Sequence, residues 1–129
     1  MPNVILKVSL KDNSLDVDQA GNGNQMGHGQ VTTISWQLTG NAAGGSFNSI
    51  NATSPGFAWI QTPTNNVFTG LQLTNNGEIQ ITDNNNDPGG ISSIGEWIYQ
   101  LCATINGKPY STIATSPRAT TTDPTIKNL

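Results

Sequence analysis

The sequence has few charged residues, few cationic residues and a single cysteine. Only 10% of the 129 residues are Asp, Glu, Lys or Arg, where an ordinary globular domain has about a quarter. Five Lys and Arg against eight Asp and Glu leave a net charge of −3, which argues against a nucleic-acid partner. Cys102 alone cannot form an internal disulfide. No run of residues has the length and apolarity of a membrane span, so we expect no membrane partner.

The polar residues that are present are mostly Asn, Thr, Gly and Ser. This composition disfavours helices and favours strands joined by turns. The length suits one domain covering residues 1–129. The opening MPNVILKVSL reads as a strand and has no signal-peptide pattern, so with one reduced thiol we expect a cytoplasmic protein.

The strongest local signal is a predicted hairpin in residues 95–115, GEWIYQLCATINGKPYSTIAT. Asn106 and Gly107 are the dipeptide preferred in a two-residue type I′ turn, where both residues need positive φ. Such a turn predicts four pairs: Ile105 with Lys108, Ala103 with Tyr110, Leu101 with Thr112, and Tyr99 with Ala114. Pro109 belongs at a sheet edge, so we expect no further strand beside residues 108–110.

Period-2 alternation elsewhere predicts further strands, each with one face on a core. The predicted strands cover residues 4–10, 15–17, 31–38, 46–50, 57–61, 67–74 and 78–82, with residues 57–61 as a central strand and Gly70 as a bulge. Residues 20–30 and 83–93 read as loops. The expected fold is therefore an all-β, antiparallel, immunoglobulin-like sandwich of about 7–9 strands, without a helix longer than about two turns.

Metal sites are poorly supported by the sequence. His28 is the only histidine, whereas a blue-copper site takes two histidines with its cysteine, and zinc needs more nitrogen and sulfur ligands. Residues 83–87 (DNNND) resemble the start of a calcium loop, but Pro88 stands where the loop needs glycine and no closing Glu follows. We interpret this segment as an oxygen-rich turn and expect no cofactor and no metal.

Catalytic motifs are absent or generic. There is no G-x-S-x-G, and His28 has no Ser or Cys partner at a recognisable spacing. Glu78 and Glu96 could supply the two carboxylates of a glycosidase, but each reads as an isolated solvated charge near a strand start. We therefore expect no enzyme and no catalytic residues, and we expect Cys102 to be a free, mostly buried thiol.

The three tryptophans raise the alternative of a carbohydrate-binding module. Trp36, Trp59 and Trp97 could stack on sugar rings, but all three occupy inward positions of the alternation. We interpret them as core residues and expect Trp36, Trp97, Leu101 and Ile79 to share one core.

The last third of the chain resembles the DP-EP family of small bacterial proteins and, more distantly, the bacterial inclusion-body protein family. The matching residues are Gly95, Trp97, Tyr99, Asn106, Gly107, Lys108, Tyr110, Asp123, Pro124 and Ile126. The family's Glu-Pro is not present here. The resemblance implies a bacterial protein with an immunoglobulin-like sandwich and carries over no catalytic residues.

Together these features predict a non-enzymatic protein that works by binding or self-association, as a homo-oligomer. The alternatives are a carbohydrate-binding module and a structural or assembly component of the phage or inclusion-body type. Residues 120–129 are expected to dock as an ordered extension anchored by Ile126, on their own sheet edge or on a second subunit.

Overall fold

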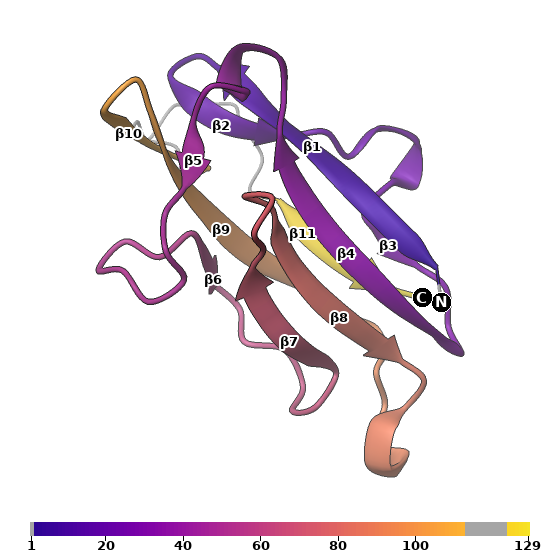
Figure 1. Ribbon diagram of the computed structural model, residues 1–129. Helices are drawn as coiled ribbons and strands as arrows, with labels where there is room; N and C mark the ends of the chain where they lie inside the picture. The colour runs from indigo at the N-terminus through magenta and orange to yellow at the C-terminus, as the bar shows by residue number, and fades with distance from the viewer. Residues whose placement is uncertain (1, 113–123) are drawn as a thin grey trace.

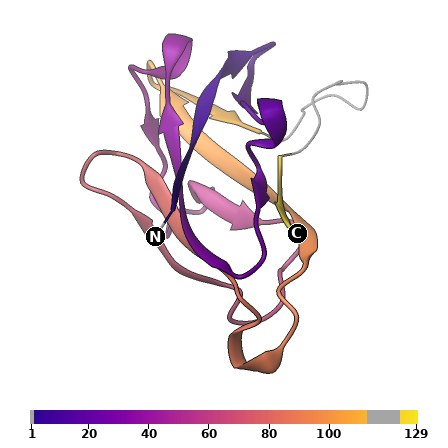
Figure 2. The ribbon, with the colours of Figure 1, turned by 90° about the vertical axis from the view of Figure 1, so that its right-hand side faces the viewer.

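The computed structural model describes residues 2–112 and 124–129 and shows two facing β-sheets (Figures 1 and 2). The first sheet has the order β2-β1-β4-β8-β7, formed by Ser14–Val17, Asn3–Lys11, Gln30–Leu38, Ile79–Asn85 and Phe68–Leu73. The second has the order β10-β9-β11-β3, formed by Lys108–Ser111, Gly95–Ile105, Thr125–Asn128 and Gln25–Met26; β5 (Ser46–Phe47) and β6 (Phe57–Trp59) also pair with β9. The helical elements of the described residues are the three-residue turns η1 (Ala20–Asn22), η2 (Gly40–Ala42) and η3 (Pro88–Gly90).

The all-β sandwich is confirmed, but its sheets are mixed and its described residues form eleven strands. β1 pairs with β4 in parallel, and β11 pairs with β3 in parallel. After β2 the chain crosses to the second sheet as β3 and re-enters the first sheet as β4, on the other side of β1 from β2. This crossover lies in residues 20–30, which the sequence presented only as a glycine-rich loop. The immunoglobulin-like strand order stays a prediction.

The hairpin of β9 and β10 has the predicted register. Ile105 pairs with Lys108 and Ala103 with Tyr110, while Thr112 N–H donates to Leu101 O at 3.1 Å. The turn residues have φ of 52° at Asn106 and 75° at Gly107, as a type I′ turn requires. The remaining predicted pair involves Ala114, which lies outside the described residues.

β9 is the central strand of the second sheet because other strands pair with both of its edges (Figure 1). One edge pairs first with β11, at residues 95–98, and then with β10, at residues 102–105. Between these pairs, Tyr99 N–H donates to Pro124 O at 3.1 Å. The opposite edge pairs with β6 and then β5. β10 is an edge strand, as Pro109 predicted.

The C-terminal strand confirms the predicted docking within the described residues 124–129. β11 pairs with β9 of the same chain, away from Pro109, and Ile126 is completely buried. Residues 120–123 of the predicted extension lie outside the described ranges. Because β11 pairs with β9 and β3 of the same chain, the docking is intramolecular.

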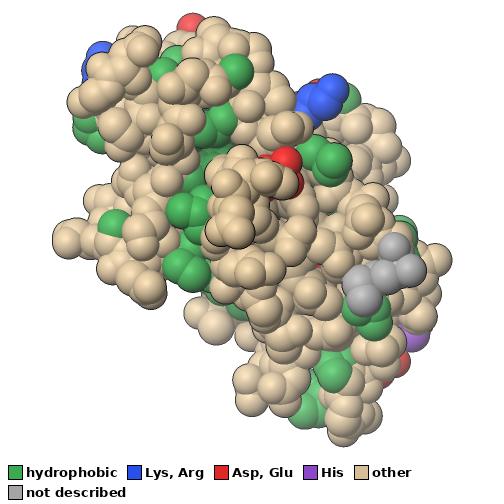
Figure 3. Space-filling view, viewed as in Figure 1, with side chains coloured by type: hydrophobic (Ala, Val, Ile, Leu, Met, Phe, Trp, Pro, Cys, Tyr) green, Lys and Arg blue, Asp and Glu red, His purple; other side chains and the backbone are tan. Residues whose placement is uncertain are grey.

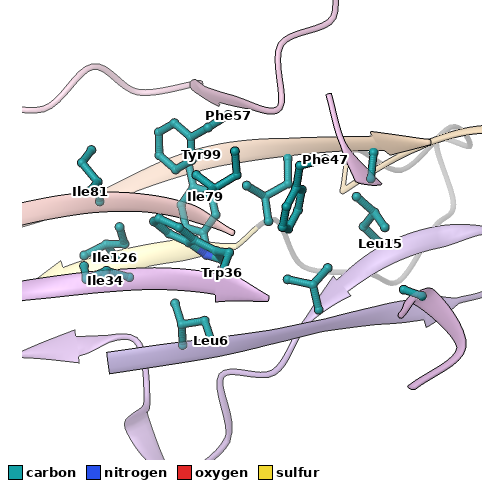
Figure 4. Close-up of a cluster of buried hydrophobic side chains, with 14 of the residues drawn as sticks. Leu6, Leu15, Ile34, Trp36, Phe47, Phe57, Ile79, Ile81, Tyr99 and Ile126 are labelled. Atoms are coloured by element: carbon teal, nitrogen blue, oxygen red, sulfur yellow. The ribbon is translucent and has the colours of Figure 1, made fainter. Parts of the chain in front are cut away.

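The core lies between the sheets and is centred on aromatic rings (Figure 4). Trp36 packs against Phe57 and Tyr99, with 5.1 Å between ring centroids in each pair, and its Nε1–H donates to Tyr99 OH at 2.7 Å. Trp36, Ile79 and Leu101 share this cluster as predicted. Trp97 is buried but lies outside the cluster, where its ring meets Phe68 at 5.5 Å.

The expectation of a central strand at residues 57–61 was wrong. β6 covers only Phe57–Trp59 and pairs with β9 alone. Phe57 is buried, Trp59 is half-buried against Phe57 and Phe68, and Ile60 is 46% exposed. The apolar run therefore reflects an inner face packed on aromatics and an outer face in contact with solvent.

Gly56 marks a close backbone approach that carries a testable prediction. A Cβ at this position would collide with the carbonyl oxygen of Asn48 and come within 3.2 Å of Ile79 Cδ1. Gly56→Ala should therefore lower the free energy of unfolding by about 1–3 kcal/mol, as overpacking does. Gly44→Ala is the matched control, because nothing lies within 4 Å of its Cβ. Urea denaturation of both variants checks this, and equal effects would contradict it.

Candidate functional site

The outer face of the second sheet carries an exposed apolar surface. We define the β9 outer face as Ile60, Ile94, Glu96, Ile98, Lys127 and Leu129. Ile94, Leu129 and Ile60 are 59%, 48% and 46% exposed, and Ile98 is half-buried. The alternation of β9 explains this face, because residues 97, 99, 101, 103 and 105 point to the inner side of the sheet and the residues between them point outward.

Strand register sets the neighbours on this face. Lys127 pairs with Glu96, and Thr125 pairs with Ile98. Leu129 and Ile94 extend the two strands just beyond the pair of Asn128 with Gly95, which places them side by side. The face thus has apolar side chains at each end. Between them, the oppositely charged Glu96 and Lys127 lie on neighbouring strands. Among the described residues, neither Glu96 nor Lys127 forms an ion pair.

The outer face of the first sheet carries the exposed Ile5 but is otherwise different, because Figure 3 shows mostly tan there, the colour of neutral polar side chains and backbone. Several of these side chains form hydrogen bonds with one another. Gln72 Nε2 donates to Gln80 Oε1 at 3.0 Å, and Gln80 Nε2 donates to Ser35 Oγ at 3.2 Å. Asn84 Nδ2 donates to Thr69 Oγ1 at 3.0 Å. A polar surface of this kind has less to gain from a partner than an apolar one.

The tryptophans do not form a stacking platform for sugars. Trp36 is completely buried, Trp97 is 9% exposed, and Trp59 packs between Phe57 and Phe68. Their interpretation as interior residues is consistent with these positions. The positions of the three tryptophans therefore do not support the carbohydrate-binding alternative.

A buried polar network joins the end of β8 to β11 and the loop before β9. Asp83, Asn85 and Ser93 are fully buried, and Asn128 is 1% exposed. Ser93 Oγ donates to Asn85 Oδ1 at 2.7 Å, and Asn85 Nδ2 donates to Met26 O at 3.0 Å. Asn128 Nδ2 donates to Asp83 Oδ1 at 2.9 Å. The network attaches the C-terminal strand to the first sheet.

Residues 83–87, which resemble the start of a calcium loop, do not fold as one continuous loop. Residues 83–85 belong to β8, not to a loop, so Asp83 and Asn85 point inward while Asn84 points to the opposite face. Their oxygens therefore do not surround a common centre, as a calcium loop requires. Within residues 2–112 and 124–129, no three His, Cys, Asp or Glu side chains lie close enough to hold a metal ion.

His28, Asp87 and Ser93 meet, but in the wrong order for nucleophilic catalysis. His28 Nε2 lies 3.0 Å from Asp87 Oδ2, and Ser93 Oγ, whose proton goes to Asn85 Oδ1, lies 3.1 Å from Asp87 Oδ1. A catalytic triad needs the histidine between serine and carboxylate, whereas here the carboxylate is in the middle. The Ser93 N–H, followed by other hydrogen bonds including that of His28, lowers the pKa of Asp87.

Glu78 and Glu96 are not brought together. Glu78 lines a polar cavity of about 440 Å³ with residues that include Gln37 and Asn75, near the turn between β7 and β8. Glu96 lies on the β9 outer face of the other sheet. The two carboxylates therefore do not flank a common cleft, as a glycosidase pair must.

Cys102 is a free thiol that is 5% exposed, as predicted. Gln100 Nε2 donates to its Sγ at 3.2 Å. Cys102 borders a shallow cavity of about 180 Å³ beside Pro109 and Tyr110. Among the residues that the structure describes, no histidine, lysine or arginine forms a hydrogen bond to this thiol.

No protein-family model matches the chain, and no curated protein matches it. The resemblance to the DP-EP family stays a prediction from its motifs. None of the helices among the described residues is long and apolar enough to cross a membrane.

Proposed function

We propose that this protein is non-enzymatic and works by self-association through the β9 outer face. This proposal is supported by the exposed apolar side chains that flank Glu96 and Lys127 on one sheet face, where neither charge forms an ion pair with another described residue. Apolar surface of this kind favours burial against a partner. The chemistry that would support catalysis is not assembled at Ser93 or between Glu78 and Glu96.

The strand register favours a second copy as the partner. A two-fold axis parallel to the strands and midway between β9 and β11 would place each β9 residue over a β11 residue of the other copy. Glu96 would then face Lys127 of the partner subunit. By symmetry, Lys127 would face Glu96 of the partner subunit. Ile94 would face Leu129 of the partner subunit in the same way. Such a patch is self-complementary, as an isologous interface requires.

Sedimentation velocity across protein concentrations tests the proposal. The wild type should form a reversible dimer, and Ile94→Asp should weaken it at least about tenfold, because the interface would bury an unpaired carboxylate. Ile5→Asp is the matched control: Ile5 is 57% exposed, close to the 59% of Ile94, but lies on the first sheet. The control should dimerise normally.

A charge exchange makes the test specific to the proposed geometry. Glu96→Lys should weaken the dimer, because two lysines would then face each other, and adding Lys127→Glu should restore it. A wild type that stays monomeric at every concentration would overturn the proposal. Larger assemblies would favour the structural alternative, and glycan-array binding that is lost on changing Trp59 would favour the carbohydrate-binding alternative.

A further inference from the structure

Two buried oxygen atoms in the polar network have no hydrogen-bond donor among the residues that the structure describes. They are Asp83 Oδ2 and Asn128 Oδ1, and both residues are at most 1% exposed. Asp83 lies on β8 of the first sheet and Asn128 on β11 of the second, so these atoms lie where the two sheets are joined. Buried acceptors without donors destabilise a fold, so this pair requires an explanation.

Turning the Asn128 amide does not provide the missing donor. Its Nδ2 donates to Asp83 Oδ1 and to the Ser93 carbonyl oxygen, both at 2.9 Å. A carbonyl oxygen only accepts hydrogen bonds, so a turned amide would place two acceptors against each other. Asn128 Oδ1 therefore stays an acceptor, and an ionised Asp83 has only acceptors to offer it.

We propose that Asp83 is a proton-binding site that holds the C-terminal strand in place. The carboxylate takes up one proton from solvent on Oδ2, and the resulting O–H donates to Asn128 Oδ1. With the existing bond from Asn128 Nδ2 to Asp83 Oδ1, this gives a carboxyl–amide pair with two hydrogen bonds. The pair satisfies both buried oxygens and links β8 to β11.

The surroundings of Asp83 favour the neutral form. The neighbouring strands β4 and β7 carry no titratable side chain, and on β11 Lys127 points to the outer face. In the loop before β9, Asp87 is held by Ser93 and His28. No cation among the described residues faces Asp83, and desolvation by burial raises the pKa of its carboxyl to about 6, against a smaller opposing effect of Asn128.

The proton makes the stability of the fold depend on pH in a defined direction. The folded pKa of Asp83 is about 6 and the ordinary value is 3.8, so the folded state binds the proton more tightly. The stabilisation is complete below about pH 4 and is lost as pH rises through about 6. A shift of roughly two pKa units corresponds to a roughly hundredfold change in the folding equilibrium.

Asp83→Asn is the decisive variant, because its amide supplies an N–H donor in place of the carboxyl proton at nearly the same shape. Urea denaturation at several pH values between 4 and 8 should show the hundredfold loss in the wild type and no such step in D83N. Asp87→Asn, an exposed carboxylate of the same network, should retain the step. Hydrogen exchange at the Lys127 and Leu129 amides, which bond to Asn24 O and Met26 O, should accelerate above pH 6 in the wild type only, after correction for intrinsic rates.

Carbon-13 NMR of the Asp83 carboxyl in the wild type tests the proposal without any substitution. A midpoint near pH 6 supports it. A midpoint at or below 3.8 overturns it, because the two oxygens would then be satisfied in some other way, such as by a bridging water. A step of equal size in D83N and the wild type overturns it as well.

Discussion

Replacing Trp36 with alanine should lower the free energy of unfolding by about 3–5 kcal/mol, the usual cost of removing a large buried aromatic side chain. Trp36 is fully buried at the centre of the core and contacts the rings of Phe57 and Tyr99. The alanine would leave a cavity between the two sheets that rigid neighbouring strands cannot fill. Urea denaturation followed by far-UV circular dichroism measures the loss.

Tyr99→Phe serves as the companion variant to Trp36→Ala. It keeps the ring but removes the hydroxyl that accepts the Trp36 Nε1–H at 2.7 Å. The indole N–H would then be buried without a partner, which costs about 1–3 kcal/mol. A Trp36→Ala loss no larger than that of Tyr99→Phe would show that the hydrogen bond, and not packing, dominates at this site.

Replacing Ile126 with alanine should cost about 2–5 kcal/mol, although it lies close to the C-terminal residue Leu129. Ile126 is completely buried in the core cluster and pairs with Trp97 in the β9–β11 ladder. Leu129→Ala is the control, because Leu129 is 48% exposed and its loss should change stability by less than about 0.5 kcal/mol. Thermal unfolding at concentrations too low for self-association compares the two. Equal losses would contradict the role of Ile126 as the anchor of β11.

The β9–β10 hairpin could be predicted to the residue because its information is local. A two-residue turn leaves one register, and the identity of Asn106 and Gly107 selects the turn. The partners of β11 could not be predicted in this way. The apolar side chain of Ile126 and the motif around it predicted an ordered extension, but they do not say which of several edges holds it.

The polar network was missed because its residues have the composition of a loop. Asp83 and Asn85 continue the alternation of Ile79 and Ile81, and all four point to the interior. The period-2 pattern was therefore present in the sequence, but a hydrophobicity pattern stops at Thr82. Recognising the buried role of Asp83 requires Asn128, which is 45 residues away in the chain.

The attachment of β11 beside β9 has a consequence for synthesis on the ribosome. Chains grow from the N-terminus, and nascent domains usually fold as units. Here residues 95–98 of β9 lack their partner on one edge, and Ile126 is missing from the core, until β11 has left the exit tunnel. Until then the nascent chain exposes an open strand edge beside an incomplete core. Such edges recruit other strands, so the nascent chain is most open to wrong strand pairing after β9 has emerged and before β11 has followed it.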